Sequence, residues 1–160
     1  MRQELHAVAV EDAAFYIIQA CEALAEAHAH GIVHRDIKPE NILLQGGHAL
    51  VADFGIALAA SRAGSGSRLT ETGMSLGTPH YMAPEQARGG AIDDRADAWG
   101  LGATLYTLLA GRPPFYGRDD EADLDILARV LRERAPDVRD RAPQVSAATA
   151  QLVARMLDPD

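Results

Sequence analysis

In residues 10–30, apolar side chains recur every three or four positions, which predicts an amphipathic helix with one buried face. Glu11 and Asp12 suit its first turn, where the helix dipole favours negative charge, and Gly31 is a stop signal. We interpret Cys21 as a small core residue on this face, with a reactive thiol as the alternative. The predicted buried face consists of Ala14, Ile17, Ile18, Cys21, Leu24, Ala25 and His28.

Further helices are predicted in the second half of the chain. Residues 97–110 are mostly apolar, which predicts a buried helix, and residues 84–89 hold a short one. Residues 119–135 and 146–160 are amphipathic, and Ser146 is a suitable N-cap for the second of them. The residues predicted to face inward are Leu124, Leu127, Val130 and Leu131 in the first of these, and Leu152, Val153, Met156 and Leu157 in the second.

One β-hairpin is predicted among these helices. Two short apolar runs, 42–44 and 49–52, flank the pair Gly46 and Gly47. Glycine tolerates the positive φ angles that a tight hairpin turn requires. The predicted fold is therefore mainly α, with a single small hairpin.

Composition and charge exclude several classes of protein. The 160 residues, 48% hydrophobic and 24% charged, fit one globular domain, and the net charge of −8 argues against a nucleic-acid partner or an anionic membrane surface. The longest apolar run, 98–111, is too short to span a bilayer, and the first residues lack the apolar segment of a signal peptide. Cys21 is the only cysteine, so no internal disulfide exists. We expect a cytoplasmic location.

The open end of the hairpin gathers candidate chemistry. If the two glycines form the turn, Asn41 lies opposite Ala52 and one step from Asp53. An amide oxygen beside a carboxylate suits a hard cation such as Mg²⁺. On the preceding loop, Asp36 could accept a proton from a hydroxyl nucleophile, and Lys38 could place positive charge on a transferring phosphoryl group.

Four motifs in this order resemble the protein-kinase signature. They are "HRDIKPEN" at 34–41, "DFG" at 53–55, "APE" at 83–85 and "DAWGLG" at 97–102, in which Gly100 replaces the usual serine. The resemblance covers essentially the whole chain and is greatest to bacterial serine/threonine kinases of the eukaryotic-like (Hanks) type. It implies the fold of the kinase C-lobe, a helical bundle whose hairpin carries the catalytic and metal-binding loops.

The resemblance also implies roles for individual residues. Asp36 would be the catalytic base, Asn41 and Asp53 would bind Mg²⁺, and Lys38 would steady the γ-phosphate of ATP. Leu43 would form part of the floor under adenine. The cofactors implied are ATP and Mg²⁺, and the substrates are proteins.

The small, polar segment 59–77 predicts a long mobile loop. In a kinase it would be the activation segment, with Thr70 and Thr72 as candidate phosphorylation sites ahead of Ser75. Arg35 resembles the arginine that grips such a phosphate. The alternative is a plain flexible linker.

Three further residues follow from the resemblance. Lys38 together with Thr78 indicates serine/threonine rather than tyrosine specificity, and Asp97 would brace the backbone of the catalytic loop. Glu85 would be buried against an arginine that the family places shortly after "LDPD", the motif at 157–160.

Two parts of a kinase are not found in the sequence. No G-x-G-x-x-G motif precedes the catalytic loop, and Lys38 is the only lysine, so a second, ATP-anchoring lysine cannot be present. Residues 1–160 are therefore predicted to be a partial kinase domain, the C-lobe without the N-lobe and the extreme C-terminal helix. The N-lobe is the expected partner, and the chain alone is expected to show no Mg·ATP-dependent thermal shift.

Two functions from different classes remain open. The chain is the catalytic lobe of a serine/threonine kinase, or it is a non-catalytic protein-binding module. The presence of Asp36, Asn41 and Asp53 together favours the first, because a binding module needs none of them.

Two other patterns have competing interpretations. His28, His30 and His34 form H-x-H-x3-H, a possible metal site, although the first two lie on different faces of a helix. The acidic residues of 119–125 could attract basic substrates, but a solvated helix start is the favoured interpretation.

Overall fold

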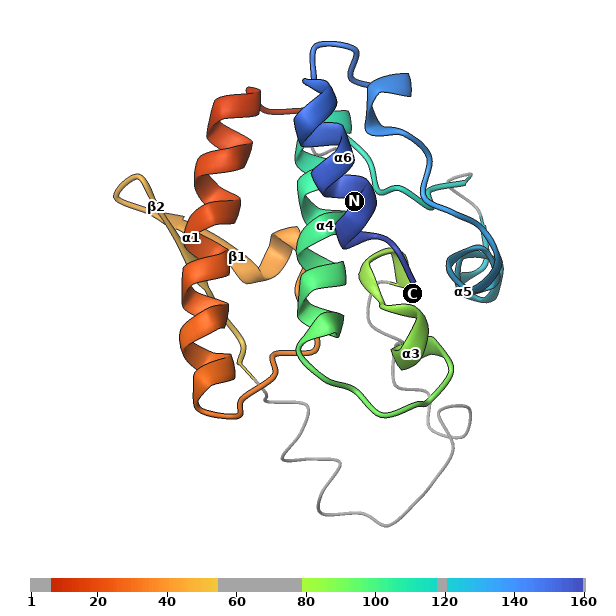
Figure 1. The fold of residues 1–160 in the computed structure, drawn as a ribbon, viewed down its shortest axis with the longest axis horizontal. Coiled ribbons are helices and arrows are strands. Elements are labelled where there is room, and N and C mark those ends of the chain that lie inside the picture. The colour runs from red at the N-terminus through yellow and green to blue at the C-terminus, as the bar shows by residue number, and fades with distance from the viewer. Residues whose placement is uncertain (1–6, 55–78, 118–120, 160) are drawn as a thin grey trace.

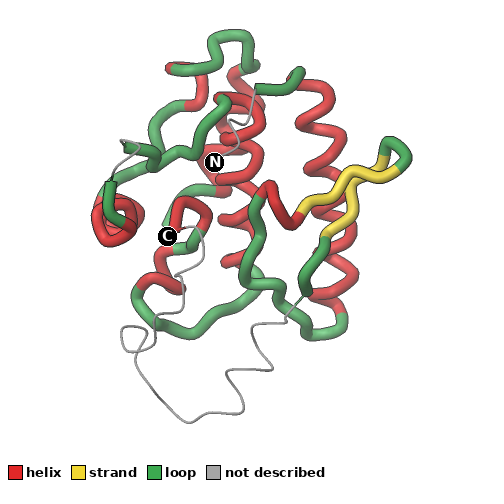
Figure 2. Tube along the Cα trace, turned by 180° about the vertical axis from the view of Figure 1, so that it is seen from behind, coloured by secondary structure: helices red, strands yellow, loops and turns green. Residues whose placement is uncertain are grey.

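A computed structural model describes residues 7–54, 79–117 and 121–159 of the chain. Its helices and strands are α1 (Val10–Ala29), β1 (Ile42–Gln45), β2 (His48–Val51), α3 (Pro84–Ala87), α4 (Arg95–Ala110), α5 (Asp123–Arg132) and α6 (Ala147–Met156). α4 lies between α1 and α6, and the hairpin of β1 and β2 packs on α1 (Figures 1 and 2). The predicted fold class, mainly α with one hairpin, is confirmed.

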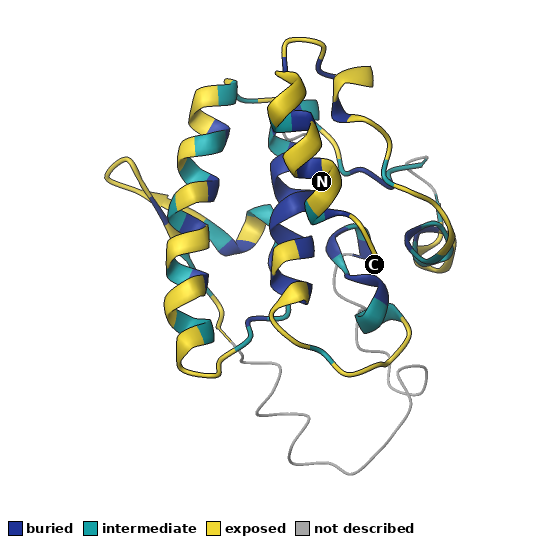
Figure 3. Cartoon of the chain, viewed as in Figure 1, coloured by how far each residue is buried: buried dark blue, intermediate teal, exposed yellow. Residues whose placement is uncertain are grey.

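α4 is buried along most of its length (Figure 3). Its own residues are mostly small or apolar, so most of its faces can pack against other elements. Ile17 and Leu24 of α1 and Val153 and Leu157 of α6 belong to the same buried cluster. The helix ends at Gly111, whose φ of 75° is the left-handed C-cap conformation. The fold is thus organised around one central helix, which begins beside the predicted catalytic loop.

The hairpin has the predicted register. Leu43 pairs with Leu50 and Leu44 with Ala49, and the turn lies at Gly46 and Gly47, both with positive φ. Gln19 of α1 fixes the hairpin to the helix, since its Oε1 accepts a hydrogen bond from the amide of Ala49 at 2.5 Å. The pairing therefore orients the open end of the hairpin relative to the helical core.

α1 ends one residue before the predicted boundary, and of its predicted buried face only Ile17 and Leu24 are buried. The buried residues are Ala13, Ile17, Ala20 and Leu24. Ile18 is 58% exposed, and Cys21 and Ala25 are exposed as well. The small side chains of Ala13 and Ala20 allow close packing, so this stripe, rather than the one through Ile18, faces the core.

Cys21 is therefore not the core residue that was predicted. Partial desolvation of its sulfur, and then the neighbouring Glu22 carboxylate, raise the pKa of the thiol. The reactive thiolate is disfavoured by the same two effects.

The predicted faces of the last two helices are partly wrong. Leu124 is 74% exposed and Leu152 is 51% exposed. In α5, Ile126 and Val130 are buried, and the helix begins at Asp123 rather than 119. α5 packs on the rest of the fold through one narrow face, which leaves Leu124 in solvent. Ser146 is the N-cap of α6 as predicted, since its Oγ accepts from the amide of Thr149 at 3.1 Å.

Several predictions fall in parts of the chain that the structure does not describe. The loop at 59–77, with Thr70, Thr72 and Ser75, and also Thr78, lie outside the described residues. Within the described ranges, no helix is long and apolar enough to cross a membrane.

We expect Gly102→Ala to lower the free energy of unfolding. A Cβ at Gly102 would lie 2.7 Å from the Cβ of Met156, so α4 and α6 would have to move apart. The overlap should cost about 1–3 kcal/mol and outweigh the helix propensity that alanine gains, about 1 kcal/mol. Urea denaturation of the chain measures the difference.

Gly90→Ala is the matched control, because its Cβ would meet only Glu85, at 3.4 and 3.9 Å. We expect that variant to unfold within about 0.5 kcal/mol of the wild type. Equal free energies of unfolding for the two variants would contradict the packing described for α4 and α6.

Candidate functional site

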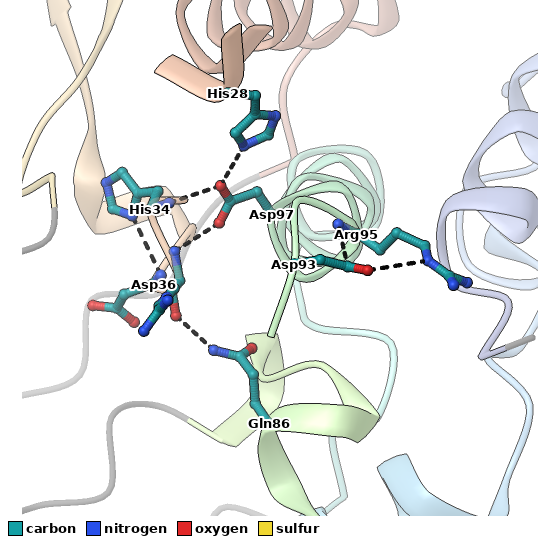
Figure 4. Close-up of polar contacts among 8 residues, drawn as sticks. His28, His34, Asp36, Gln86, Asp93, Arg95 and Asp97 are labelled. Atoms are coloured by element: carbon teal, nitrogen blue, oxygen red, sulfur yellow. Dashed lines mark hydrogen bonds and ion pairs between the residues drawn. The ribbon is translucent and has the colours of Figure 1, made fainter. Parts of the chain in front are cut away.

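The carboxylate of Asp97, in the first turn of α4, binds the loop that precedes the hairpin. Oδ2 accepts a hydrogen bond from the amide of His34 at 2.8 Å, and Oδ1 accepts one from the amide of Arg35 at 2.7 Å. The Nε2 atom of His28 lies 2.7 Å from Oδ2 (Figure 4). The bracing contact predicted for Asp97 is present.

Asp97 is buried, which makes these hydrogen bonds necessary for its stability in the fold. The residue is 0% exposed, and a buried carboxylate is tolerated only when hydrogen bonds or opposite charge replace its water. Because a carboxylate oxygen only accepts, Nε2 of His28 must carry the proton in this contact. α1, α4 and the loop are thus joined at one buried carboxylate.

Arg35 has a left-handed backbone conformation, with φ of 71°. This conformation is unfavourable for a residue with a side chain and persists only when its surroundings fix it. Here the amide of Arg35 donates to Asp97, and its carbonyl accepts a hydrogen bond from Nε2 of Gln86 at 2.8 Å. These two contacts fix the backbone immediately before Asp36. Gln86 is a contact that the sequence analysis missed.

His34 joins this loop to the end of β2. Its Nε2 lies 2.7 Å from the carbonyl oxygen of Ala52, and its ring packs edge-on against Phe54, with centroids 4.8 Å apart. Asp53, between those two residues, also has a positive φ, 61°. Asp36 and Asp53 therefore lie on two segments that are fixed to each other.

The three histidines of the H-x-H-x3-H pattern have separate partners. His28 contacts Asp97, His34 contacts Ala52, and Nδ1 of His30 lies 2.9 Å from the carbonyl oxygen of Glu26. In the part of the chain that the structure describes, no three His, Cys, Asp or Glu side chains are grouped as a metal site. The alternative interpretation of these histidines as joint metal ligands is wrong.

Asp36 is held by Lys38 and Asn41, which follow it in the same loop. Nζ of Lys38 donates to Oδ2 at 2.8 Å, and Nδ2 of Asn41 donates to the same oxygen at 3.1 Å and to the Asp36 carbonyl at 2.7 Å. Asn41 is buried, whereas the side chain of Asp36 is 51% exposed. Hydrogen bonds thus fix one oxygen of the carboxylate, while the side chain remains accessible to solvent.

Asn41 lies opposite Ala52, one step from Asp53, at the open end of the hairpin. The amide of Ala52 donates to the carbonyl oxygen of Asn41 at 2.8 Å, which extends the strand pairing by one step, as predicted. Nδ2 of Asn41 is already engaged with Asp36, so its Oδ1 is the atom left for a ligand. An amide oxygen and a carboxylate are the type of donor that Mg²⁺ takes, and water and phosphate oxygens would complete its shell. The residues present therefore fit this cation.

The remaining predicted site residues are less tightly held. Leu43 is 52% exposed on β1. Glu85 is half-buried rather than buried, and it lines a cavity of about 330 Å³ with Trp99 and Arg155. Nε of Arg35 is shielded from solvent and has no hydrogen-bond partner among the described residues.

The whole chain, residues 1–160, matches the sequence profile of the protein kinase domain. It is 43% identical over 139 residues to the DNA damage-responsive serine/threonine-protein kinase RqkA of Deinococcus radiodurans, covering 86% of this chain and 20% of that protein.

Other bacterial relatives have similar names. Identity is 40% over 146 residues to the serine/threonine-protein kinase PknB of Mycolicibacterium smegmatis, which covers 89% of this chain and 23% of PknB. It is 44% over 144 residues to the serine/threonine-protein kinase Pkn1 of Myxococcus xanthus, which covers 87% of this chain and 20% of Pkn1. The chain thus spans only 20% to 23% of the length of these relatives.

We expect Asp97→Asn to destabilise the fold strongly. The asparagine keeps one acceptor oxygen, so at least one of the buried donors that meet Asp97 loses its partner. The loss of charge-assisted bonds and an unpaired buried amide should cost about 2–4 kcal/mol. Urea unfolding of the chain at neutral pH measures this change.

Asp94→Asn provides the control at the same helix start, because Asp94 is exposed and its side chain makes no capping hydrogen bond. Its free energy of unfolding should change by less than about 0.5 kcal/mol. If the two variants were equally stable, the bracing role of Asp97 would be refuted.

Proposed function

The chain belongs to the protein kinase domain family, and we propose that the protein containing it transfers the γ-phosphate of ATP to serine and threonine hydroxyls of proteins. One observation carries the proposal: the carboxylate of Asp36 is held by Lys38 and Asn41, and its side chain is 51% exposed, which leaves it accessible to a substrate. The relatives support the amino-acid specificity, since they are named serine/threonine-protein kinases.

In this proposal Asp36 is the general base. Oδ2 is occupied by Lys38 and Asn41, so Oδ1 is the oxygen that faces an incoming hydroxyl. As the hydroxyl oxygen forms its bond to the γ-phosphorus, the bond from that phosphorus to the β–γ bridging oxygen breaks and ADP leaves. The hydroxyl proton passes to Asp36, which stabilises the transition state by general base catalysis.

Lys38 serves two purposes in this arrangement. Its ammonium group lies 2.8 Å from Asp36 and fixes the direction of the carboxylate. The same charge would stabilise the negative charge that develops on the transferring phosphoryl group. Thr78 would complete the serine/threonine specificity that the family resemblance implies.

Asn41 and Asp53 would hold Mg²⁺ through Oδ1 and the carboxylate. The cation, when bound, supplies positive charge that neutralises the phosphate oxygens of ATP. The two residues keep their relative position because the hairpin pairing extends to Asn41 and Ala52. Leu43, exposed on β1, would lie under adenine.

Other parts of the nucleotide site would come from outside these 160 residues. Lys38 is the only lysine of the chain, and it is engaged with Asp36, so a second lysine for the ATP phosphates has to be supplied by another segment. We therefore propose that this chain is the C-lobe of a kinase domain whose N-lobe completes the ATP site. Arg35 would bind a phosphate on Thr70 or Thr72, and Glu85 would pair with an arginine.

The test is phosphotransfer by the full-length protein with Mg·ATP and a library of serine- and threonine-containing peptides. Asp36→Asn should lower kcat by about 10²–10⁴-fold, because the amide cannot accept the hydroxyl proton. Phosphoamino-acid analysis of the wild-type products should show phosphoserine and phosphothreonine without phosphotyrosine.

Asp12→Asn serves as the control, because Asp12 is exposed on α1, at the far end from the Asp97 contact. Its kcat should match that of the wild type. Unchanged phosphotransfer in Asp36→Asn would exclude Asp36 as the base, and a wild-type protein without transfer would exclude the kinase function.

A further inference from the structure

Gln86 contacts two separate backbone segments with the two ends of its side-chain amide. Its Oε1 accepts a hydrogen bond from the amide of Ala83 at 2.9 Å, at the N-terminus of α3. Its Nε2 donates to the carbonyl oxygen of Arg35 at 2.8 Å. Figure 4 shows Gln86 reaching from α3 towards the loop that carries Asp36. One side chain therefore joins the α3 segment to this loop.

The carbonyl that Gln86 binds belongs to the peptide unit immediately before Asp36. The N–H of that unit donates to Nδ1 of His34 at 3.3 Å, so both polar groups of the unit have side-chain partners. Arg35 precedes this unit with φ of 71°, and its own amide is held by Asp97. Asp97 thus fixes one side of the left-handed residue and Gln86 fixes the other.

The chemistry of the two contacts selects a primary amide. The amide of Ala83 only donates and the carbonyl of Arg35 only accepts, so the side chain between them must offer one acceptor and one donor. Glutamine has both on one rigid plane. A carboxylate would lack the donor, and a methionine would lack both groups.

The segment that carries Gln86 is itself fixed to α4. Tyr81 is buried, and its hydroxyl hydrogen-bonds Thr107 of the central helix. Burial raises the pKa of Tyr81 well above its ordinary value, so the hydroxyl stays protonated. Gln86 therefore acts from a rigid support rather than from a free loop.

We propose that Gln86 is a positioning residue for phosphotransfer: it orients the peptide unit between Arg35 and Asp36 and thereby sets the direction of the Asp36 carboxylate. The inference rests on the proposed kinase function and deepens it. The hydrogen bonds of Gln86 also link α3 to the catalytic loop, so displacement of α3 would turn Asp36 away from its substrate.

Gln86→Glu and Gln86→Met in the full-length protein separate the two contacts. The glutamate keeps an acceptor for Ala83, but when ionised it cannot donate to the Arg35 carbonyl, and the two oxygens repel each other. When protonated it regains a donor, and the carbonyl favours that form, which raises its pKa above the usual value of about 4.3. Methionine has a similar length and has no donor at any pH.

We expect Gln86→Glu to lower kcat about tenfold at pH 8, because one hydrogen bond to a positioned group is lost. The KM for ATP should stay within about twofold of the wild-type value. The ratio of its kcat to that of the wild type should rise at least about threefold between pH 8 and pH 5.5, as protonation restores the donor. Gln86→Met should be impaired with a ratio that does not change with pH. Gln151→Glu, exposed on α6, adds the same charge and should match the wild type.

Two results would overturn the inference. One is a kcat of Gln86→Glu within about twofold of the wild type at pH 8, and the other is an impaired kcat whose ratio to the wild type is independent of pH. If Gln86→Glu fails to fold, the uncharged Gln86→Met tests the inference instead. An unimpaired kcat of Gln86→Met would exclude the positioning role. A wild-type protein that transfers no phosphate to any peptide would instead overturn the proposed function, and the role of Gln86 would fall with it.

Discussion

The carboxylate of Asp97 is fully buried at the start of α4 and accepts hydrogen bonds from the amides of His34 and Arg35 and from the ring of His28. The proposed base, Asp36, depends on this contact for its position in the fold. It fixes the loop that carries Asp36 to the central helix of the core, and the core around α4 is closely packed. Asp36 lies in a loop, but the backbone before it is fixed to a helix. Such a fixed position suits a group that has to meet a reacting hydroxyl.

Backbone strain is concentrated beside the two acids of the site. Arg35, directly before Asp36, has φ of 71°, and Asp53 itself has φ of 61°. Left-handed residues with side chains are unfavourable by about 1–2 kcal/mol each, so each needs surroundings that fix it. Asp97 and Gln86 hold the first, and His34, through the carbonyl of Ala52, holds the chain beside the second. These contacts fix the backbone beside both acids of the proposed site.

The sequence predicted the local features well and the distant contacts unevenly. The hairpin register, and with it Asn41 opposite Ala52, followed from two glycines between two short apolar runs, because both signals are local. The faces of the helices followed only in part: Ile18 is exposed because the alanine-rich α1 can pack through either of two neighbouring stripes, and Leu124 is exposed on α5. Gln86 was missed because its partner lies 51 positions away, and because Ala83 lacks the N-cap hydroxyl that would have marked Gln86 as part of a capping box.

Amide hydrogen exchange of the chain, resolved by NMR, tests the central claim most directly. If Asp97 holds the loop, the amides of His34 and Arg35 should exchange only by global unfolding, with the same opening free energy as the amide of Leu105 in the middle of α4. Their protection should also greatly exceed that of Gly46 in the hairpin turn. Exchange of His34 and Arg35 at the rate of Gly46 would contradict the account, because the carboxylate would then not be binding them in solution.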